Sequence, residues 1–247
     1  AMAGPTPVSA LIHAATMVTA GVYLIVRTHV LFLLAPDVLV AISIGAAITL
    51  LLASLAALVQ SDIKRVLAYS TISQIGYMFL AVGVGAWSAA MFHFLTHAVF
   101  KALLFLSAGA ISMRLHHEQN IFKMGGLHNK IPLAFWSFLI GSASLAALPV
   151  VSAGSFSKEM ILGSVWFDPT IGPILWGAGL LGALITATYI SRVVFLVFFG
   201  PVHSEVSGRY GLRIMVPLII LAVGSLLVGW LETPGFLGGN RMVTVLL

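Results

Sequence analysis

The sequence contains no cysteine, and only 8% of its 247 residues are charged. Without cysteine the chain forms no disulfide and supplies no thiolate ligand to a metal or an iron–sulfur cluster, so a redox cofactor must lie on another chain. Ordinary soluble domains carry about 25% charged residues. The scarcity of charge therefore excludes a water-facing globule and a disordered tail.

Apolar residues make up 60% of the chain, and the mean hydropathy is +1.10. They fall in long runs separated by short polar joints, which is typical of membrane-spanning helices and not of the ~10-residue alternating strands of an outer-membrane barrel. We therefore predict an all-α polytopic membrane helix bundle with about seven transmembrane helices. The expected spans are residues 7–26, 38–59, 66–86, 88–111, 131–168, 173–199 and 214–231.

The fifth expected span, 131–168, is too long for one straight helix, because about 20 residues suffice to cross the hydrocarbon. Residues 148–155 interrupt it with Pro149 and Gly154. Two interpretations fit: two short spans that meet there, or one helix broken inside the membrane.

The positions of the 12 basic residues decide between these interpretations. With seven spans, the basic joints lie on one face, which is the pattern of a cytoplasmic face and places Ala1 there too. Splitting the fifth span would move two arginines to the wrong side, so we favour one broken span. The residues of the basic face are Lys64, Arg65, Arg114, Lys123, Lys130, Arg209 and Arg213, and the opposite joints hold only Arg27 and Arg241.

His93, His97 and Lys101 recur at four-residue intervals in the fourth span, which places them on one helical face. Lys101 lies about fourteen residues after Trp87, near the bilayer centre. A lysine at that depth costs about 2.5–3.5 kcal/mol, so it should face protein or water. Three such groups about 6 Å apart can pass protons along the helix. The structural alternative is a Lys101 paired with an acid and histidines bonded across helices.

Two further places in the apolar spans carry polar groups. At the break, we expect Ser155 to cap the new half-helix, and Lys158 either carries protons or forms a local ion pair with Glu159. His13 lies alone in the first span, where an interhelical hydrogen bond and a role in proton transfer both remain open.

Three other patterns have simpler interpretations. The glycines of residues 177–182 match a nucleotide-binding fingerprint, but no strand precedes them, so we expect close helix packing. The joint with His116, His117, Glu118 and His128 lacks the spacing of a metal site, so we predict a solvated loop. We expect Asp62 to start a capped helix and Arg192 to extend to the membrane interface.

Several long phrases resemble the antiporter-like membrane subunits of respiratory complex I, the proton-pumping NADH:quinone oxidoreductase, and in particular their L-type branch. The phrases are residues 4–18, residues 62–74, the His93, His97 and Lys101 series, and residues 156–159. The resemblance covers essentially the whole chain. Multi-subunit sodium/proton antiporters are also similar, although Thr19 stands where those relatives often carry lysine.

The resemblance implies two inverted five-helix repeats, of which this chain holds the second. It implies that Lys101 is the lysine of the central axis, that His93 and His97 connect toward it, that Lys158 ends the second half-channel, and that His13 bridges the two half-channels. The family's glutamate–lysine pair belongs to the first repeat, so this segment alone should not pump. The chain begins at Ala1 and stops within the apolar run 242–247, so we expect a single membrane-embedded segment of a longer subunit.

The resemblance also implies that NADH, flavin, iron–sulfur clusters and quinone are bound by other subunits, with no cofactor in this chain. The expected partners are other membrane subunits of complex I, including neighbouring antiporter-like subunits, together with the lipid bilayer, protons and water. We expect no nucleic acid partner and a location in the bacterial inner membrane. The alternatives are a sodium/proton antiporter subunit and a structural membrane scaffold.

Overall fold

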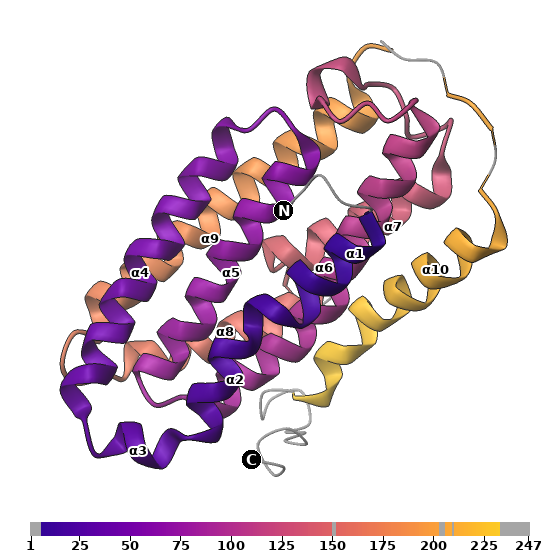
Figure 1. Ribbon diagram of the computed structural model, residues 1–247. Coiled ribbons are helices and arrows are strands. Elements are labelled where there is room, and N and C mark those ends of the chain that lie inside the picture. Colours follow the sequence, from indigo (N-terminus) through magenta and orange to yellow (C-terminus); the bar gives the residue numbers. More distant parts are fainter. Residues whose placement is uncertain (1–5, 150–151, 203–205, 209, 233–247) are drawn as a thin grey trace.

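The computed structural model describes residues 6–149, 152–202, 206–208 and 210–232, apart from the side chains of His13 and Ala14 (Figure 1). Over these ranges the chain is helical, with one isolated β-bridge between two joints. The elements are α1 (Thr6–Ser9), η1 (Ala10–Ala15), η2 (Met17–Thr19), α2 (Ala20–Arg27), α3 (His29–Leu33), α4 (Pro36–Val59), α5 (Ile63–Gly83), α6 (Trp87–Arg114), η3 (Ile121–Lys123), α7 (Pro132–Ala146), α8 (Ala153–Trp166), α9 (Gly172–Val194), η4 (Phe195–Phe199), α10 (Leu212–Leu227) and η5 (Val228–Leu231).

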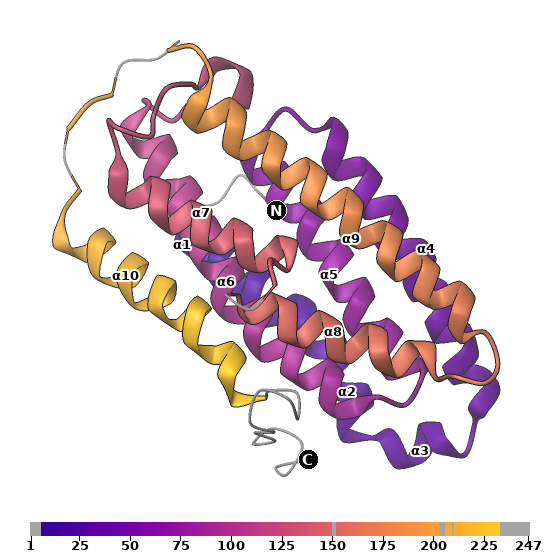
Figure 2. The same cartoon turned by 180° about the vertical axis from the view of Figure 1, so that it is seen from behind.

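The bundle contains seven spans, one of them broken. Six helical stretches are long and apolar enough to cross a membrane: Thr6–Arg27, Pro36–Val59, Ile63–Gly83, Trp87–Arg114, Gly172–Phe199 and Leu212–Leu231. Two further helices, α7 and α8, are too short to span separately, and they follow one another along the long axis (Figure 2). The predicted all-α bundle with a broken fifth span is therefore confirmed.

The break follows from the residues between α7 and α8. Ala147 adopts the left-handed conformation, with φ 58° and ψ 48°, and its turn is closed by a bond from the Leu148 N–H to the Ala143 carbonyl. Helix α8 begins after Ser152, whose backbone is extended. The prediction that Ser155 caps α8 is wrong: Ser155 lies inside the first turn, and its hydroxyl donates to the Ser152 carbonyl at 2.8 Å.

The three basic joints lie at one end of the bundle. The N–H of Ile63 donates to the carbonyl of Gln119, which ties the first joint to the second. The N–H of Ser207 donates to the carbonyl of Arg114, which ties the third joint to the second. The predicted grouping of these joints is confirmed, while Arg209 and Arg241 lie outside the described residues.

Asp62 and Arg192 both act at helix ends near these joints. The Asp62 carboxylate accepts hydrogen bonds from the N–H groups of Lys64 and Arg65, which confirms the predicted cap of α5. Arg192 does not simply extend to the interface. Its guanidinium donates to the carbonyls of Leu58 at 2.7 Å and Gln60 at 3.1 Å, and so satisfies the C-terminal end of α4.

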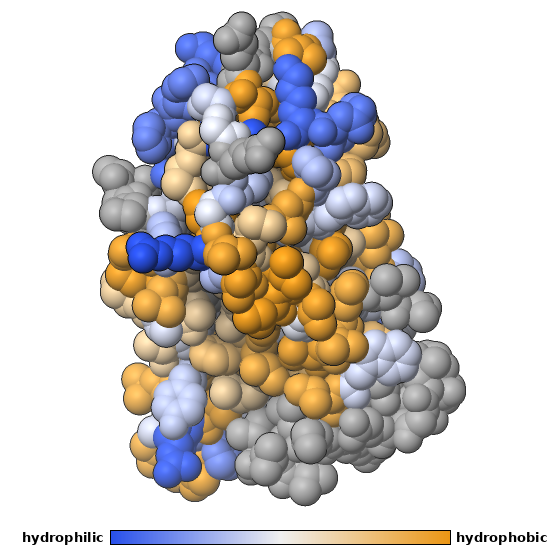
Figure 3. All heavy atoms as spheres, turned by 90° about the vertical axis from the view of Figure 1, so that its right-hand side faces the viewer, coloured by the Kyte–Doolittle hydropathy of each residue, from blue (hydrophilic) through white to orange (hydrophobic). Residues whose placement is uncertain are grey.

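The surface fits a bilayer. Hydrophobic side chains gather across the middle of the face in Figure 3, and hydrophilic ones gather toward its upper end. Many large apolar side chains are exposed on the outer helices, among them Leu184 and Ile220. Together with the apolar helices, this distribution makes the chain a multi-pass membrane protein.

Candidate functional site

Lys101 lies at the midpoint of α6 and is completely buried. Its amino group donates to two acceptors on the neighbouring helix α5, the carbonyl of Leu67 at 3.3 Å and the hydroxyl of Ser70. A charged group buried among helices needs such partners, because an unpaired one carries a large desolvation cost. Both partners are neutral. Among the described residues, Lys101 is therefore not paired with an acidic side chain, which was the structural alternative.

His93 and His97 continue from Lys101 along the same face of α6. Their ring centroids are 6.1 Å apart, and both side chains are completely buried. This is the geometry that the four-residue spacing predicts. His93 Nδ1 lies 2.9 Å from the hydroxyl of Ser157 on α8, so the series of polar groups passes from α6 to the half-helix after the break.

Lys158 follows Ser157 in α8 and is also buried. Its amino group donates to the carbonyl of Leu145 at 2.7 Å. That carbonyl belongs to the last turn of α7, where intrahelical partners are missing and the helix dipole favours a cation. The alternative of a local ion pair with Glu159 is not what the structure shows. Glu159 is exposed, and the ion pair found among the described residues joins Lys123 and Glu118.

Tyr77 on α5 contacts both Lys158 and His93, and the sequence pattern did not single it out. The Lys158 amino group lies 5.1 Å from the centroid of its ring, and the ring of His93 lies 6.3 Å away on centroids. The Tyr77 hydroxyl donates to the carbonyl of Gly179 at 2.5 Å, which fixes the ring. Tyr77 is seven residues after Ser70 and so lies on the same face of α5, a spacing that could have identified both.

His13 lies in the π-helix η1, which packs against α6. Its side chain is outside the described residues, so its predicted bonding role stays a prediction. Single turns of π-helix occur frequently at functional sites. The backbone around His13 is therefore consistent with a function at this position.

The remaining sequence patterns have structural explanations. A Cβ atom added to Gly179 would lie 2.6 Å from Leu162 Cδ2, and one added to Gly182 would lie 2.2 Å from Leu50 Cδ2, which confirms close helix packing. In the solvated joint, the Glu118 carboxylate accepts hydrogen bonds from the backbone N–H groups of Asn120 and Gln119. These bonds hold the pKa of Glu118 below its usual range.

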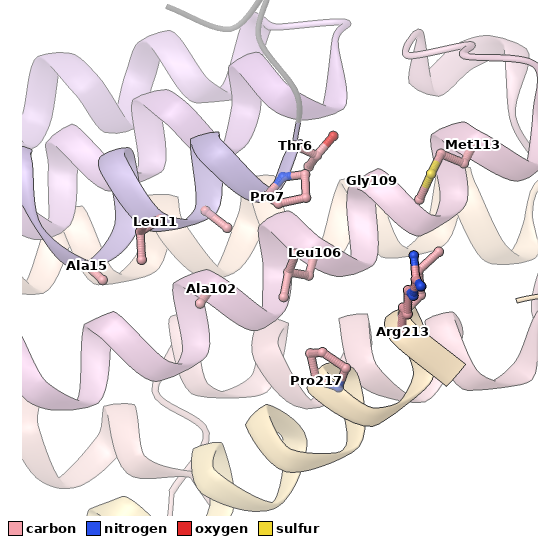
Figure 4. Close-up of a pocket in the computed structure, with 12 residues that line it drawn as sticks. Thr6, Pro7, Leu11, Ala15, Ala102, Leu106, Gly109, Met113, Arg213 and Pro217 are labelled. Atoms are coloured by element: carbon pink, nitrogen blue, oxygen red, sulfur yellow. The ribbon is translucent and has the colours of Figure 1, made fainter. Parts of the chain in front are cut away.

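A cavity of about 350 Å³ lies on the other side of α6, between η1 and α10 (Figure 4). Its lining is almost entirely apolar, with Arg213 at one end. Lys101 and the two histidines do not line it. The cavity is therefore separate from the buried polar groups.

Seven spans, a broken fifth helix and two buried lysines on either side of a histidine pair define an antiporter-like membrane subunit. Residues 1–186 match the family described as NADH:quinone oxidoreductase/Mrp antiporter, transmembrane region, and the chain belongs to that family. The chain spans less than two fifths of the length of its curated relatives.

Three of these relatives cover nearly the whole chain. NADH-quinone oxidoreductase subunit L is 59% identical over 238 residues in Escherichia coli K12 and 58% in Pseudomonas aeruginosa, covering 96% of this chain and 38% of each relative. NADH-ubiquinone oxidoreductase chain 5 of Triticum aestivum is 46% identical over 246 residues, covering 96% of this chain and 36% of the relative.

Two solved structures share the fold. A chain of the membrane-bound sulfane sulfur reductase, an archaeal respiratory membrane complex, aligns with a TM-score of 0.79 and 27% identity, covering 98% of this chain and 49% of that one. A chain of the Mrp complex from Dietzia sp. aligns with a TM-score of 0.75 and 23% identity, covering 85% and 47%.

Proposed function

We propose that this chain is part of a membrane subunit of NADH:quinone oxidoreductase and that it translocates protons through its buried lysines and histidines. The observation that carries the proposal is the pair of buried lysines, Lys101 and Lys158, joined through His93 and His97. In the part of the chain that the structure describes, neither lysine forms an ion pair. The names of the curated relatives support the assignment to this enzyme.

The order of groups in space suggests the route. Lys101 and His97 are one helical turn apart, and His97 and His93 are the next pair along the same face. His93 contacts Ser157, the residue before Lys158. One water molecule can bridge a step of about 6 Å, because a bridging water replaces a direct hydrogen bond at little cost.

The neutral partners of the lysines favour transfer over a purely structural role. A cation in mid-membrane that is held by a carboxylate gains from keeping its charge, whereas one held by carbonyl and hydroxyl groups retains acceptors after it gives up the proton. Lys101 and Lys158 both have partners of the second kind. We assign His13 to a bridge between the two half-channels, and Lys158 to the end from which protons leave.

The driving reaction belongs to other subunits in this proposal. NADH, flavin, iron–sulfur clusters and quinone are bound elsewhere in the complex, and their chemistry changes the charge on these buried groups at a distance. The partners are other membrane subunits, including neighbouring antiporter-like ones, with lipid, water and protons. We place the chain in the bacterial inner membrane, with its N-terminal end and basic joints on the cytoplasmic side.

The test is substitution of each lysine in the full-length subunit of the assembled enzyme. Lys101→Ala and Lys158→Ala should each lower proton uptake into inverted vesicles and the coupled rate of quinone reduction. Lys130→Ala is the matched control, because Lys130 is exposed on the basic joint and should leave both rates unchanged. Wild-type proton uptake in both buried-lysine variants would overturn the proposal.

The same vesicles separate the alternatives. A sodium/proton antiporter subunit predicts proton movement that depends on a sodium gradient and continues without NADH. A structural scaffold predicts that Lys101→Met, which keeps the length of the side chain, leaves proton uptake intact while it changes stability.

A further inference from the structure

We propose that Gln74 on α5 is a positioning residue for proton transfer, which holds the hydrogen-bond network at His97 between Lys101 and His93. The proposal rests on the proposed function and adds a residue to it. It comes from one observation: Gln74 is completely buried, and neither its amide nitrogen nor its amide oxygen has a hydrogen-bond partner among the described residues.

The register of α5 and α6 places Gln74 beside the histidine pair. The two helices are antiparallel neighbours, joined by Val84–Ala86 (Figure 1). They are in contact at two levels, Ser70 with Lys101 and Tyr77 with His93.

Gln74 lies four residues after Ser70, on the same face of α5 and about 6 Å further along the helix. His97 lies four residues before Lys101 on α6. Because the two helices are antiparallel, the step from Lys101 to His97 runs in the same direction in space as the step from Ser70 to Gln74, and it is also about 6 Å long. Gln74 and His97 therefore occupy the same level, midway between the two contacts.

A buried amide without partners is costly, because both of its polar ends lose their bonds to water. Such groups are rare in native proteins and call for a reason. Gln74 is not alone: the Nε2 atom of His93 also has no partner among the described residues, although Nδ1 of the same ring is bonded. Two buried polar side chains with unpartnered atoms, Gln74 and His93, thus lie along the part of the proposed route that follows Lys101.

Glutamine suits this position chemically. Its amide presents a donor and an acceptor on one uncharged group. It can bond an imidazole ring in either tautomer, or a water molecule that moves between the rings, without adding a charge to the centre of the membrane. An acid or a base at this position would instead hold or repel the proton.

The decisive variant is Gln74→Met in the full-length subunit of the assembled enzyme. Methionine is nearly isosteric with glutamine, so packing is kept, and removal of an unpartnered buried amide should leave the thermal stability equal or higher. We expect proton uptake to fall about threefold to tenfold, the effect of losing one hydrogen bond. We also expect a larger solvent isotope effect on turnover. Gln74→Asn, which keeps an uncharged amide on a side chain one methylene shorter, should retain more proton uptake than Gln74→Met.

Two controls make the result specific. Ser107→Ala removes an unpartnered buried hydroxyl on α6. Ser107 is six residues after Lys101 and so lies on a different face of that helix, and this variant should keep wild-type uptake. Lys101→Ala tests the proposed function itself. If Lys101→Ala abolishes uptake while Gln74→Met keeps it, or if Gln74→Met and Ser107→Ala lose it equally, the role of Gln74 is refuted and the proposed function stands.

Discussion

Gly154 offers the sharpest test of the broken helix, because the second residue of α8 lies against the end of α7. A Cβ atom at Gly154 would lie 1.7 Å from the carbonyl oxygen of Ser144. Carbon–oxygen contacts are about 3.3 Å or longer, so Gly154→Ala must separate the two half-helices by about 1.6 Å. The 2.7 Å bond from Lys158 to the Leu145 carbonyl spans the same junction and would be stretched beyond hydrogen-bonding distance.

The expected cost combines two effects. Overpacking of a tight site costs about 1–3 kcal/mol, and loss of a hydrogen bond to a charged group costs about 1.5–3 kcal/mol. We therefore expect the free energy of unfolding to fall by about 2.5–6 kcal/mol, and we expect proton uptake to fall as well. The assay is unfolding of the purified full-length subunit by a denaturing detergent, followed by its helical signal.

Gly163→Ala is the matched control in the same helix. A Cβ atom at Gly163 meets nothing within 4 Å, and alanine is favoured over glycine in a helix interior by about 1 kcal/mol. The control should therefore be at least as stable as the wild type. If Gly154→Ala unfolds at the same detergent concentration as Gly163→Ala, the close junction of the half-helices is wrong.

Three further predictions follow from single contacts. Asp62→Ala removes the cap of α5 and should lower the free energy of unfolding by about 1 kcal/mol, whereas Asp62→Asn should keep most of it; equal losses would contradict the cap. Tyr77→Phe removes the bond to the Gly179 carbonyl and keeps the ring beside Lys158, so stability should fall by about 1 kcal/mol while proton uptake persists; loss of uptake would show that the hydroxyl takes part. Because the pKa of Glu118 is lower in the folded protein, its contribution to stability is present above the usual value of 4.5 and is lost as pH falls further; in thermal unfolding from pH 6 to pH 3, Glu118→Gln should lack this component.

The spans were predictable because each follows from local sequence. A helix that crosses the bilayer needs about 20 apolar residues wherever it lies, so runs of that length identify it without knowledge of its neighbours. The break was predictable for the same reason, since Pro149 and Gly154 interrupt a run that is too long. The exact start of α8 was not, because Ser152 and Ser155 are both suitable residues, and the turn at Ala147 decides where the next helix begins.

The polar face of α6 was also predictable, because four-residue spacing fixes which side chains share a face. The partners of those side chains were not. Ser70 bonds Lys101 across 31 residues of sequence, Ser157 meets His93 across 64, and Tyr77 reaches Gly179 across 102. Such pairs depend on which helices become neighbours, and short-range spacing carries no information about that.

The broken helix and the buried polar groups depend on each other. Residues one position apart on a helix point about 100° apart and do not face the same neighbour. Ser157 therefore contacts His93 on α6, while Lys158 contacts the end of α7 and the ring of Tyr77 on α5. Had α7 and α8 formed one continuous helix, the carbonyl of Leu145 would bond within the helix and Lys158 would lose its acceptor. The break thus supplies the acceptor that lets a lysine lie one residue from the histidine contact, and a substitution that closes or widens it should affect stability and proton uptake together.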